Sequence, residues 1–203
     1  MIKNIHQMWL GPDKIPEEFQ LNIDLLKNNN PTYTHYFWDN KKALEEFPEI
    51  EIFFRLECVP TFISNWLRLR VLEKYGGWYI DVDYTPHISL GLDKLIEELK
   101  IQDTDIILIE ANLHNFQVNN GFYYCNKLNF NNHLNYLPDA PIMRVFNDYI
   151  EATTYSMFII KAKYIGMNGI YFKEKRMRSF YAHKHFKFRL VKDKDNTFKL
   201  VQI

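Results

Sequence analysis

The sequence predicts a single α/β domain over residues 1–203, with an open sheet flanked by helices and a β-rich C-terminal tail. Strand-like and helix-like patterns alternate through residues 1–125, which is typical of α/β folds. A chain of 203 residues can build one substantial core but is short for two domains of typical size. An apolar content of 47% and an aromatic content of 16% indicate a folded chain rather than a disordered one.

The first 58 residues alternate strand and helix patterns. Residues 2–10 alternate in polarity as expected for a strand, and residues 17–28 carry apolar side chains at helical spacing before an Asn-rich stop. Residues 33–38 predict a second strand, after which Asp39 begins a short helix rich in Lys and Glu. We therefore expect a strand–helix–strand–helix order at the N-terminus.

The stretch from Pro60 to Asp83 contains the strongest helix and the most unusual strand. Aromatic and aliphatic residues keep a helical period from Pro60, and Gly76 is placed as the C-cap. The strand that follows ends in two carboxylates. Since side chains i and i+2 of an extended strand share a face, Asp81 and Asp83 are expected to point one way and Val82 into the core.

The remainder of the chain predicts further alternating elements. Helices are expected at 92–99 and 141–152, and strands at 105–110, 121–124, 180–182, 186–191 and 198–203. The charged run 192–196 between the last two strands is expected to be a solvated hairpin loop.

Composition excludes several classes of function. Basic and acidic residues balance at 25 each, which removes the electrostatic case for duplex nucleic acid as the main partner and leaves only a local basic patch open. Cys58 and Cys125 are too few for a disulfide framework or a metal cage, so both are expected to be small buried thiols. The N-terminus lacks a signal-peptide pattern and no apolar run suggests a membrane span, so a cytoplasmic location is expected.

Two carboxylates at the end of a buried strand contribute little to the stability of a fold, but their oxygens are suitable ligands for a hard divalent cation.

The run Asp81 to Thr85 also satisfies the DxDxT motif of aspartate-nucleophile phosphatases of the haloacid dehalogenase type. That motif normally sits near the start of such chains, whereas about 80 residues precede it here. A phosphatase is therefore the remote alternative.

Three motifs in order resemble the glycosyltransferases with the DXD sugar-binding region, of the family 32 type and, more distantly, the large clostridial glucosylating toxins. Residues 5–11 (Ile-His-Gln-Met-Trp-Leu-Gly) are similar to the family's opening strand, within which His6 is expected to be structural. Residues 64–68 (Ser-Asn-Trp-Leu-Arg) resemble its arginine-bearing helix, and residues 76–83 match its GG-x-Y-x-D-x-D strand.

The resemblance implies a GT-A fold, Mn²⁺ or Mg²⁺, and transfer of a sugar with retention. The implied donor is a nucleotide-diphosphate sugar, a UDP-sugar first and a GDP-sugar second, and the acceptor a glycan, a lipid-linked saccharide or a protein. The implied donor-binding residues are Trp9, Leu10, Asn65, Arg68, Gly77, Tyr79, Asp81 and Val82.

The resemblance also implies roles for the charged groups. Trp9 would stack on the base of the nucleotide. The residues that would act in catalysis are Asp81, Asp83 and Arg68. Asp83, together with Asp81, would hold the metal. His183 and His185 are candidates for a further metal ligand, and Asn119 and Asn120 are candidates for contact with the acceptor. Asn65 stands where the family helix carries an acid, which leaves a non-catalytic nucleotide-sugar or glycan binder as an alternative.

Overall fold

The computed structural model describes residues 1–58, 60–87, 91–102, 106–112, 117–126, 157–160, 165–166, 171–174, 188–192 and 198–202. The predicted helix at 141–152, the predicted strand at 180–182 and the two histidines His183 and His185 lie outside these residues.

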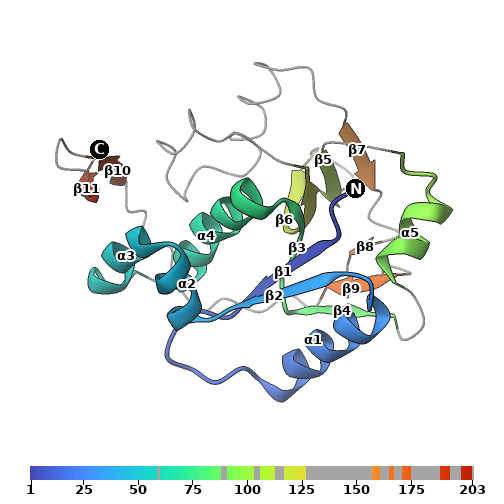
Figure 1. The fold of residues 1–203 in the computed structure, drawn as a ribbon, viewed down its shortest axis with the longest axis horizontal. Helices are drawn as coiled ribbons and strands as arrows, with labels where there is room; N and C mark the ends of the chain where they lie inside the picture. Colours follow the sequence, from blue (N-terminus) through green and yellow to red (C-terminus); the bar gives the residue numbers. More distant parts are fainter. Residues whose placement is uncertain are drawn as a thin grey trace.

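A six-stranded mixed sheet, ordered β2-β1-β3-β6-β5-β7, forms the centre of the fold (Figure 1). Its strands are β1 (Asn4–Met8), β2 (Thr34–Trp38), β3 (Gly77–Ile80), β5 (Ile106–Asn112), β6 (Gln117–Cys125) and β7 (Met157–Ile160). β1 runs parallel to β2 and β3, whereas β6 is antiparallel to β3 and β5. The carboxyl ends of β1, β2 and β3 therefore meet at one edge, next to the first half of β6.

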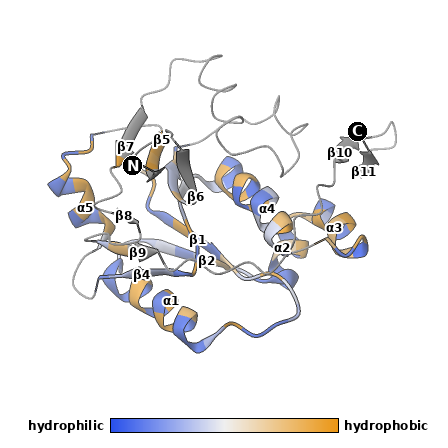
Figure 2. Cartoon of the chain, turned by 180° about the vertical axis from the view of Figure 1, so that it is seen from behind, coloured by the Kyte–Doolittle hydropathy of each residue, from blue (hydrophilic) through white to orange (hydrophobic). Residues whose placement is uncertain are grey.

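Helices cover both faces of this sheet. They are α1 (Glu17–Asn29), α2 (Asn40–Glu46), α3 (Glu51–Arg55), α4 (Pro60–Tyr75) and α5 (Leu92–Glu98), with a 3₁₀ turn η1 (Pro48–Ile50) before α3. Both α1 and α4 mix hydrophobic and hydrophilic residues along their length (Figure 2), as expected for helices that bury one side. The predicted α/β class, with a mixed central sheet between helices, is confirmed.

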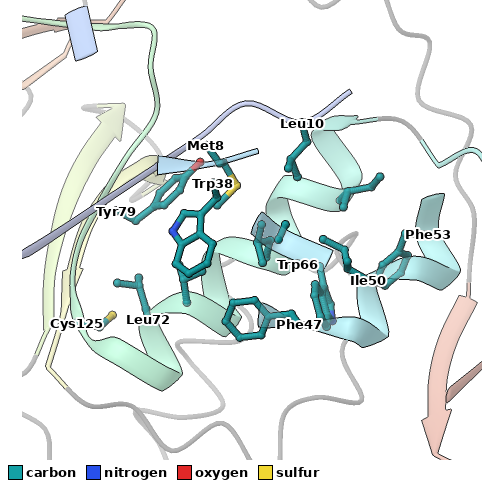
Figure 3. Close-up of a cluster of buried hydrophobic side chains, with 14 of the residues drawn as sticks. Met8, Leu10, Trp38, Phe47, Ile50, Phe53, Trp66, Leu72, Tyr79 and Cys125 are labelled. Carbon is teal, nitrogen blue, oxygen red and sulfur yellow. The ribbon is translucent and has the colours of Figure 1, made fainter. Parts of the chain in front are cut away.

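Two buried clusters hold the layers together, one on each face of the sheet. The first joins α2, α3 and α4 to strand residues that include Met8, Trp38 and Tyr79 (Figure 3). The second joins α1 and α5 to the opposite face through Ile5, Trp78 and others. Because Trp78 and Tyr79 are neighbours on β3 yet belong to different clusters, the strand is buried on both faces.

Smaller sheets complete the described chain. β4 (Tyr84–Pro86), β9 (Phe172–Glu174) and β8 (Ile165–Gly166) form one sheet in that order. β10 (Phe188–Lys192) pairs with β11 (Phe198–Gln202) in antiparallel fashion, as predicted for the tail. The sequence pattern did not predict α3, β4, β7, β8 or β9, since segments of two to five residues carry too little periodicity.

Two glycines make a tight connection from α4 to β3. Gly76 has φ +61°, and its N–H donates to the carbonyl oxygen of Leu72 at 2.8 Å, so the predicted C-cap is confirmed. Gly77 has φ +106°, and a Cβ there would lie 2.5 Å from the carbonyl oxygen of Asn4 on β1. These positions therefore accept only glycine without strain.

Among the residues that the structure describes, no helix has the length and apolar character needed to cross a membrane. Cys125 is buried as predicted, whereas Cys58 is only partly buried, and both thiols are free.

His6 is a fully buried structural residue of β1, as expected. Its Nε2 donates to the carbonyl oxygen of Gly76 at 3.0 Å, and its Nδ1 accepts from the indole N–H of Trp38 at 3.3 Å. These partners suit a neutral ring, which stacks on Tyr36 at 4.9 Å between centroids. Burial lowers the pKa of His6 from 6.5 to about 4, opposed by the Gly76 hydrogen bond and aided by Lys42.

We predict that His6 makes the fold acid-sensitive. The unfolded chain takes up a proton near pH 6.5 and the folded chain only near pH 4, so the free energy of unfolding falls as the pH drops between these values. The contribution that His6 loses is about 3 kcal/mol. Chemical denaturation at pH 7 and pH 4 should show a smaller pH-dependent loss for His6→Gln than for the wild type. Equal losses in the two proteins would contradict the assignment.

Candidate functional site

The two aspartates lie on a turn directly after β3. Strand β3 ends at Ile80, and the N–H of Tyr84 donates to the carbonyl oxygen of Asp81 at 3.3 Å, so residues 81–83 are not extended. The expectation of a strand through Asp83 is therefore wrong. The N–H of Asp81 makes a last ladder bond to Gly121 of β6 at 2.7 Å, after which the chain leaves the central sheet to form β4 against β9. Val82 is buried, as predicted, and both aspartates are partly exposed.

Asp81 is held from the side of α4 by a buried arginine and a buried tyrosine. Nη2 of Arg68 lies 3.5 Å from Oδ1 of Asp81, and the Tyr79 hydroxyl donates to the same oxygen. The Arg68 side chain is 4% exposed, whereas that of Asp81 is 33% exposed. The guanidinium also packs over the Tyr79 ring at 4.5 Å and donates to the carbonyl oxygen of Ser64. Arg68 therefore lies beneath Asp81 rather than open to solvent.

The protonation states of this trio follow from burial and charge. Burial lowers the pKa of Arg68, but Asp81 and the tyrosines Tyr79 and Tyr123 raise it, so the net pKa lies above its ordinary value. Burial is also the main reason that the pKa of Tyr79 is raised well above its ordinary value, so its hydroxyl stays protonated and can donate. Arg68 is therefore a permanent cation and the Tyr79 hydroxyl a permanent donor, and both act on the Asp81 carboxylate.

The two aspartates offer only oxygen atoms as ligands for a metal ion. Within the described residues, both contacts to the Asp81 carboxylate reach Oδ1, which leaves Oδ2 available to a ligand. Asp83 adds a second, partly exposed carboxylate. In the same described part of the chain, no group of three His, Cys, Asp or Glu could hold a metal ion. Two carboxylates fit Mg²⁺ or Mn²⁺ that takes its other ligands from phosphates and water.

Trp9 lies at the same edge of the sheet, one residue beyond the carboxyl end of β1. Its indole N–H donates to the carbonyl oxygen of Asp13 at 2.8 Å, and its ring lies 6.0 Å from that of Phe19 on α1. The residue is partly exposed, whereas the adjacent Leu10 is 7% exposed. Because β1 and β3 are parallel neighbours, an aromatic platform and the acidic turn follow adjacent strands.

The other predicted site residues divide into three kinds. Asn65 is partly exposed on α4, three residues before Arg68. Gly77 serves the close approach of β3 to β1, as described above. Asn119 and Asn120 belong to β6 directly before Gly121, whose carbonyl oxygen accepts from Asp81, so their backbone runs beside the acidic turn.

Sequence reasoning missed one buried polar residue at this turn. Nδ2 of Asn22 on α1 donates to the carbonyl oxygen of Val82 at 3.1 Å. Asn22 has the helical spacing of the core-facing residues Phe19 and Leu26, and a polar residue at such a position is the signal that could have found it.

Comparison with known proteins gives two kinds of match. Residues 16–104 match the family model described as a glycosyltransferase sugar-binding region containing the DXD motif. This range contains Asn65, Arg68 and both aspartates, whereas Trp9 precedes it. None of the curated proteins matches this sequence.

Two solved structures are similar to this chain. One is a glycosyltransferase involved in the glycosylation of the major capsid of PBCV-1, with a TM-score of 0.54 at 12% identity, over 90% of this chain and 95% of that one. The other is the PaToxG glycosyltransferase, with a TM-score of 0.41 at 22% identity, over 73% of this chain and 60% of that one.

The mixed sheet with helices on both faces and an acidic turn after β3 defines a fold of the GT-A type. Within it, residues 16–104, less than half of the chain, match the glycosyltransferase sugar-binding region with the DXD motif, and Asp81, Val82 and Asp83 provide that motif. The chain therefore shares its fold with a glycosyltransferase and, over residues 16–104, is similar in sequence to the sugar-binding region of such enzymes.

We predict that the buried ion pair beneath the turn contributes to stability. Replacing Arg68 with Met removes the charge that faces Asp81 and should lower the free energy of unfolding by about 2 kcal/mol, less than for a fully buried pair because Asp81 is partly exposed. Tyr79→Phe keeps the ring and loses one hydrogen bond, so it should cost about 1 kcal/mol. Urea denaturation measures both, and an Arg68→Met variant as stable as the wild type would refute the role of this pair.

Proposed function

We propose that the protein is a metal-dependent glycosyltransferase that moves a sugar from a nucleotide-diphosphate donor to a hydroxyl acceptor, with retention of anomeric configuration. A UDP-sugar is the first candidate donor and a GDP-sugar the second. The candidate cation is Mn²⁺ or Mg²⁺. Asp83, assisted by Asp81, would hold it.

One observation carries this proposal: an anchored carboxylate and an aromatic platform follow adjacent parallel strands. Asp81 is fixed through Oδ1, and Trp9 follows β1 at the same edge of the sheet. Open α/β sheets bind their ligands at the carboxyl ends of the strands. A nucleoside diphosphate needs these features, namely a flat surface for its base and a cation site for its phosphates.

The bound cation would neutralise the charge that develops on the leaving diphosphate. The chain's own groups orient the donor. Trp9 stacks on the base, and the free oxygen of Asp81 accepts a hydrogen bond from a ribose or sugar hydroxyl. Arg68 and Tyr79 act through Asp81 by fixing its carboxylate, so they are positioning residues.

The acceptor would be a glycan, a lipid-linked saccharide or a protein, approached from the side of β6. The similar capsid glycosylation enzyme suggests that glycans attached to protein belong among the acceptors to be tested. Asn119 and Asn120 are the candidates for contact with the acceptor, because their backbone runs beside the acidic turn.

The position of the motif counts against the phosphatase alternative. Its nucleophile would be Asp81, but about 80 residues precede it, whereas the motif normally lies near the start of such chains. Asn65, in place of the acid of the family helix, is the feature that favours the non-catalytic binder. Slow hydrolysis of a UDP-sugar with Mn²⁺ and no acceptor would exclude it, and turnover of an aryl phosphate with Mg²⁺ would instead support the phosphatase.

A thermal-shift screen of UDP- and GDP-sugars with and without Mn²⁺ tests the proposed function. Binding to the folded state raises the unfolding temperature. We expect a shift with one nucleotide series that needs the cation. Absence of any Mn²⁺-dependent shift across both series would contradict the proposal.

We predict that Asp83→Ala abolishes Mn²⁺-dependent binding of UDP and leaves the fold intact, because the residue is partly exposed on a turn. Titration calorimetry with and without Mn²⁺ measures the effect. The matched control is Asp24→Ala, which removes an exposed carboxylate from α1 and should bind UDP as the wild type does. Unchanged Mn²⁺-dependent affinity in Asp83→Ala would exclude Asp83 as a ligand.

We predict that Trp9→Ala weakens UDP binding by about 1–3 kcal/mol, the range for stacking of a base on an aromatic ring. Trp9→Phe keeps a flat ring and should retain most of the affinity. Both proteins are compared by calorimetry at one Mn²⁺ concentration. If Trp9→Phe loses as much as Trp9→Ala, stacking is not the role of this side chain.

A further inference from the structure

We propose that Asn22 on α1 is a positioning residue that sets the place of the acidic turn from the face opposite Arg68. This inference rests on the proposed function for its effect on the donor. The placement of the turn itself can be tested without metal or nucleotide.

The contact is buried and central to the turn. Asn22 is 6% exposed, and its Nδ2 donates to the carbonyl oxygen of Val82 at 3.1 Å. Val82 separates the two aspartates, so its peptide group connects directly to Asp83. A shift of this carbonyl therefore moves the second carboxylate, whereas the salt bridge of Arg68 is to the first.

The turn is thus held from both faces of the sheet. Arg68 comes from α4, whose core includes Tyr79, and Asn22 comes from α1, whose core includes Ile5 and Trp78. After Asp81 the backbone has left its ladder with β6, so the Val82 carbonyl needs a donor from elsewhere. The Asn22 amide supplies it.

Helix α1 also contacts the other half of the proposed donor site. Phe19, whose ring lies 6.0 Å from that of Trp9, precedes Asn22 by three residues. Residues three apart lie on one side of a helix. A single turn of α1 therefore contacts both Trp9 and the Val82 peptide, and fixes the spacing between the base platform and the acidic turn.

The chain offers a matched control on the same helix. Asn30, the C-cap of α1, is 2% exposed, and its side chain bonds the carbonyl oxygen of Leu26 at 2.8 Å and the N–H of Leu92 at 2.7 Å. It is a buried asparagine that bonds the backbone, as Asn22 is, but its partners are outside the acidic turn. Loss of Asn30 should lower stability and leave the turn unchanged.

The test compares Asn22→Leu and Asn30→Ala with the wild type in the full chain. Leu has the same branched outline as Asn and a higher helix propensity, so Asn22→Leu removes the donor with little harm to α1. If Asn22→Leu does not fold, Asn22→Ala makes the same change. Hydrogen exchange reports the N–H of Tyr84, which closes the turn on Asp81, and calorimetry reports Mn²⁺-dependent UDP binding.

We expect faster exchange at Tyr84 and about a 10-fold loss of Mn²⁺-dependent UDP affinity in Asn22→Leu, as for partners that orient metal ligands. Asn30→Ala should change neither beyond its effect on global stability. Unchanged exchange at Tyr84 in Asn22→Leu, or unchanged affinity where the wild type binds, overturns the inference. If the wild type binds no UDP with Mn²⁺, the proposed function fails, and the exchange result alone decides the role of Asn22.

Discussion

The buried guanidinium of Arg68 is the constraint on which the site depends. A cation that is 4% exposed requires a counter-charge and acceptors around it, and Asp81, the Tyr79 ring and the carbonyl oxygen of Ser64 meet that need. The short connection through Gly76 and Gly77 brings them together. Arg68 lies seven residues before the end of α4, about 10 Å back along the helix, and Asp81 lies four residues beyond Gly77, the first residue of β3, about 13 Å on. The two side chains are therefore level.

Much of this arrangement could be predicted from the sequence because its signals are local. The helical period after Pro60, the C-cap at Gly76 and each of the three motifs lie within short windows. The acidic turn could not be predicted in the same way. A period of two continues through Asp83, but the strand ends at Ile80 because the chain exchanges β6 for β9 as its partner, and strand pairing is a property of distant segments.

Buried polar residues account for the other difference. Arg68 and Asn22 follow the spacing of core positions, yet sequence reasoning treats a cation or an amide as a solvated or ligand-binding group. In the fold each has a specific partner that satisfies it, Asp81 for Arg68 and the Val82 carbonyl for Asn22. His6 could be interpreted correctly because a histidine within an apolar strand is more often structural than catalytic. The sequence pattern does not identify the group with which each of these buried polar residues interacts.

Anchoring one oxygen of Asp81 restricts what the carboxylate can do. With Oδ1 held by Arg68 and Tyr79, the group cannot rotate freely, so Oδ2 points in one direction before any ligand arrives. A preorganised acceptor costs little reorganisation when the donor binds, which is the usual source of electrostatic catalysis. The cores on the two faces of the sheet locate the turn that carries this group, since α4 holds Asp81 and α1 holds Val82. Repacking of either core could therefore disturb the acidic turn without touching an aspartate.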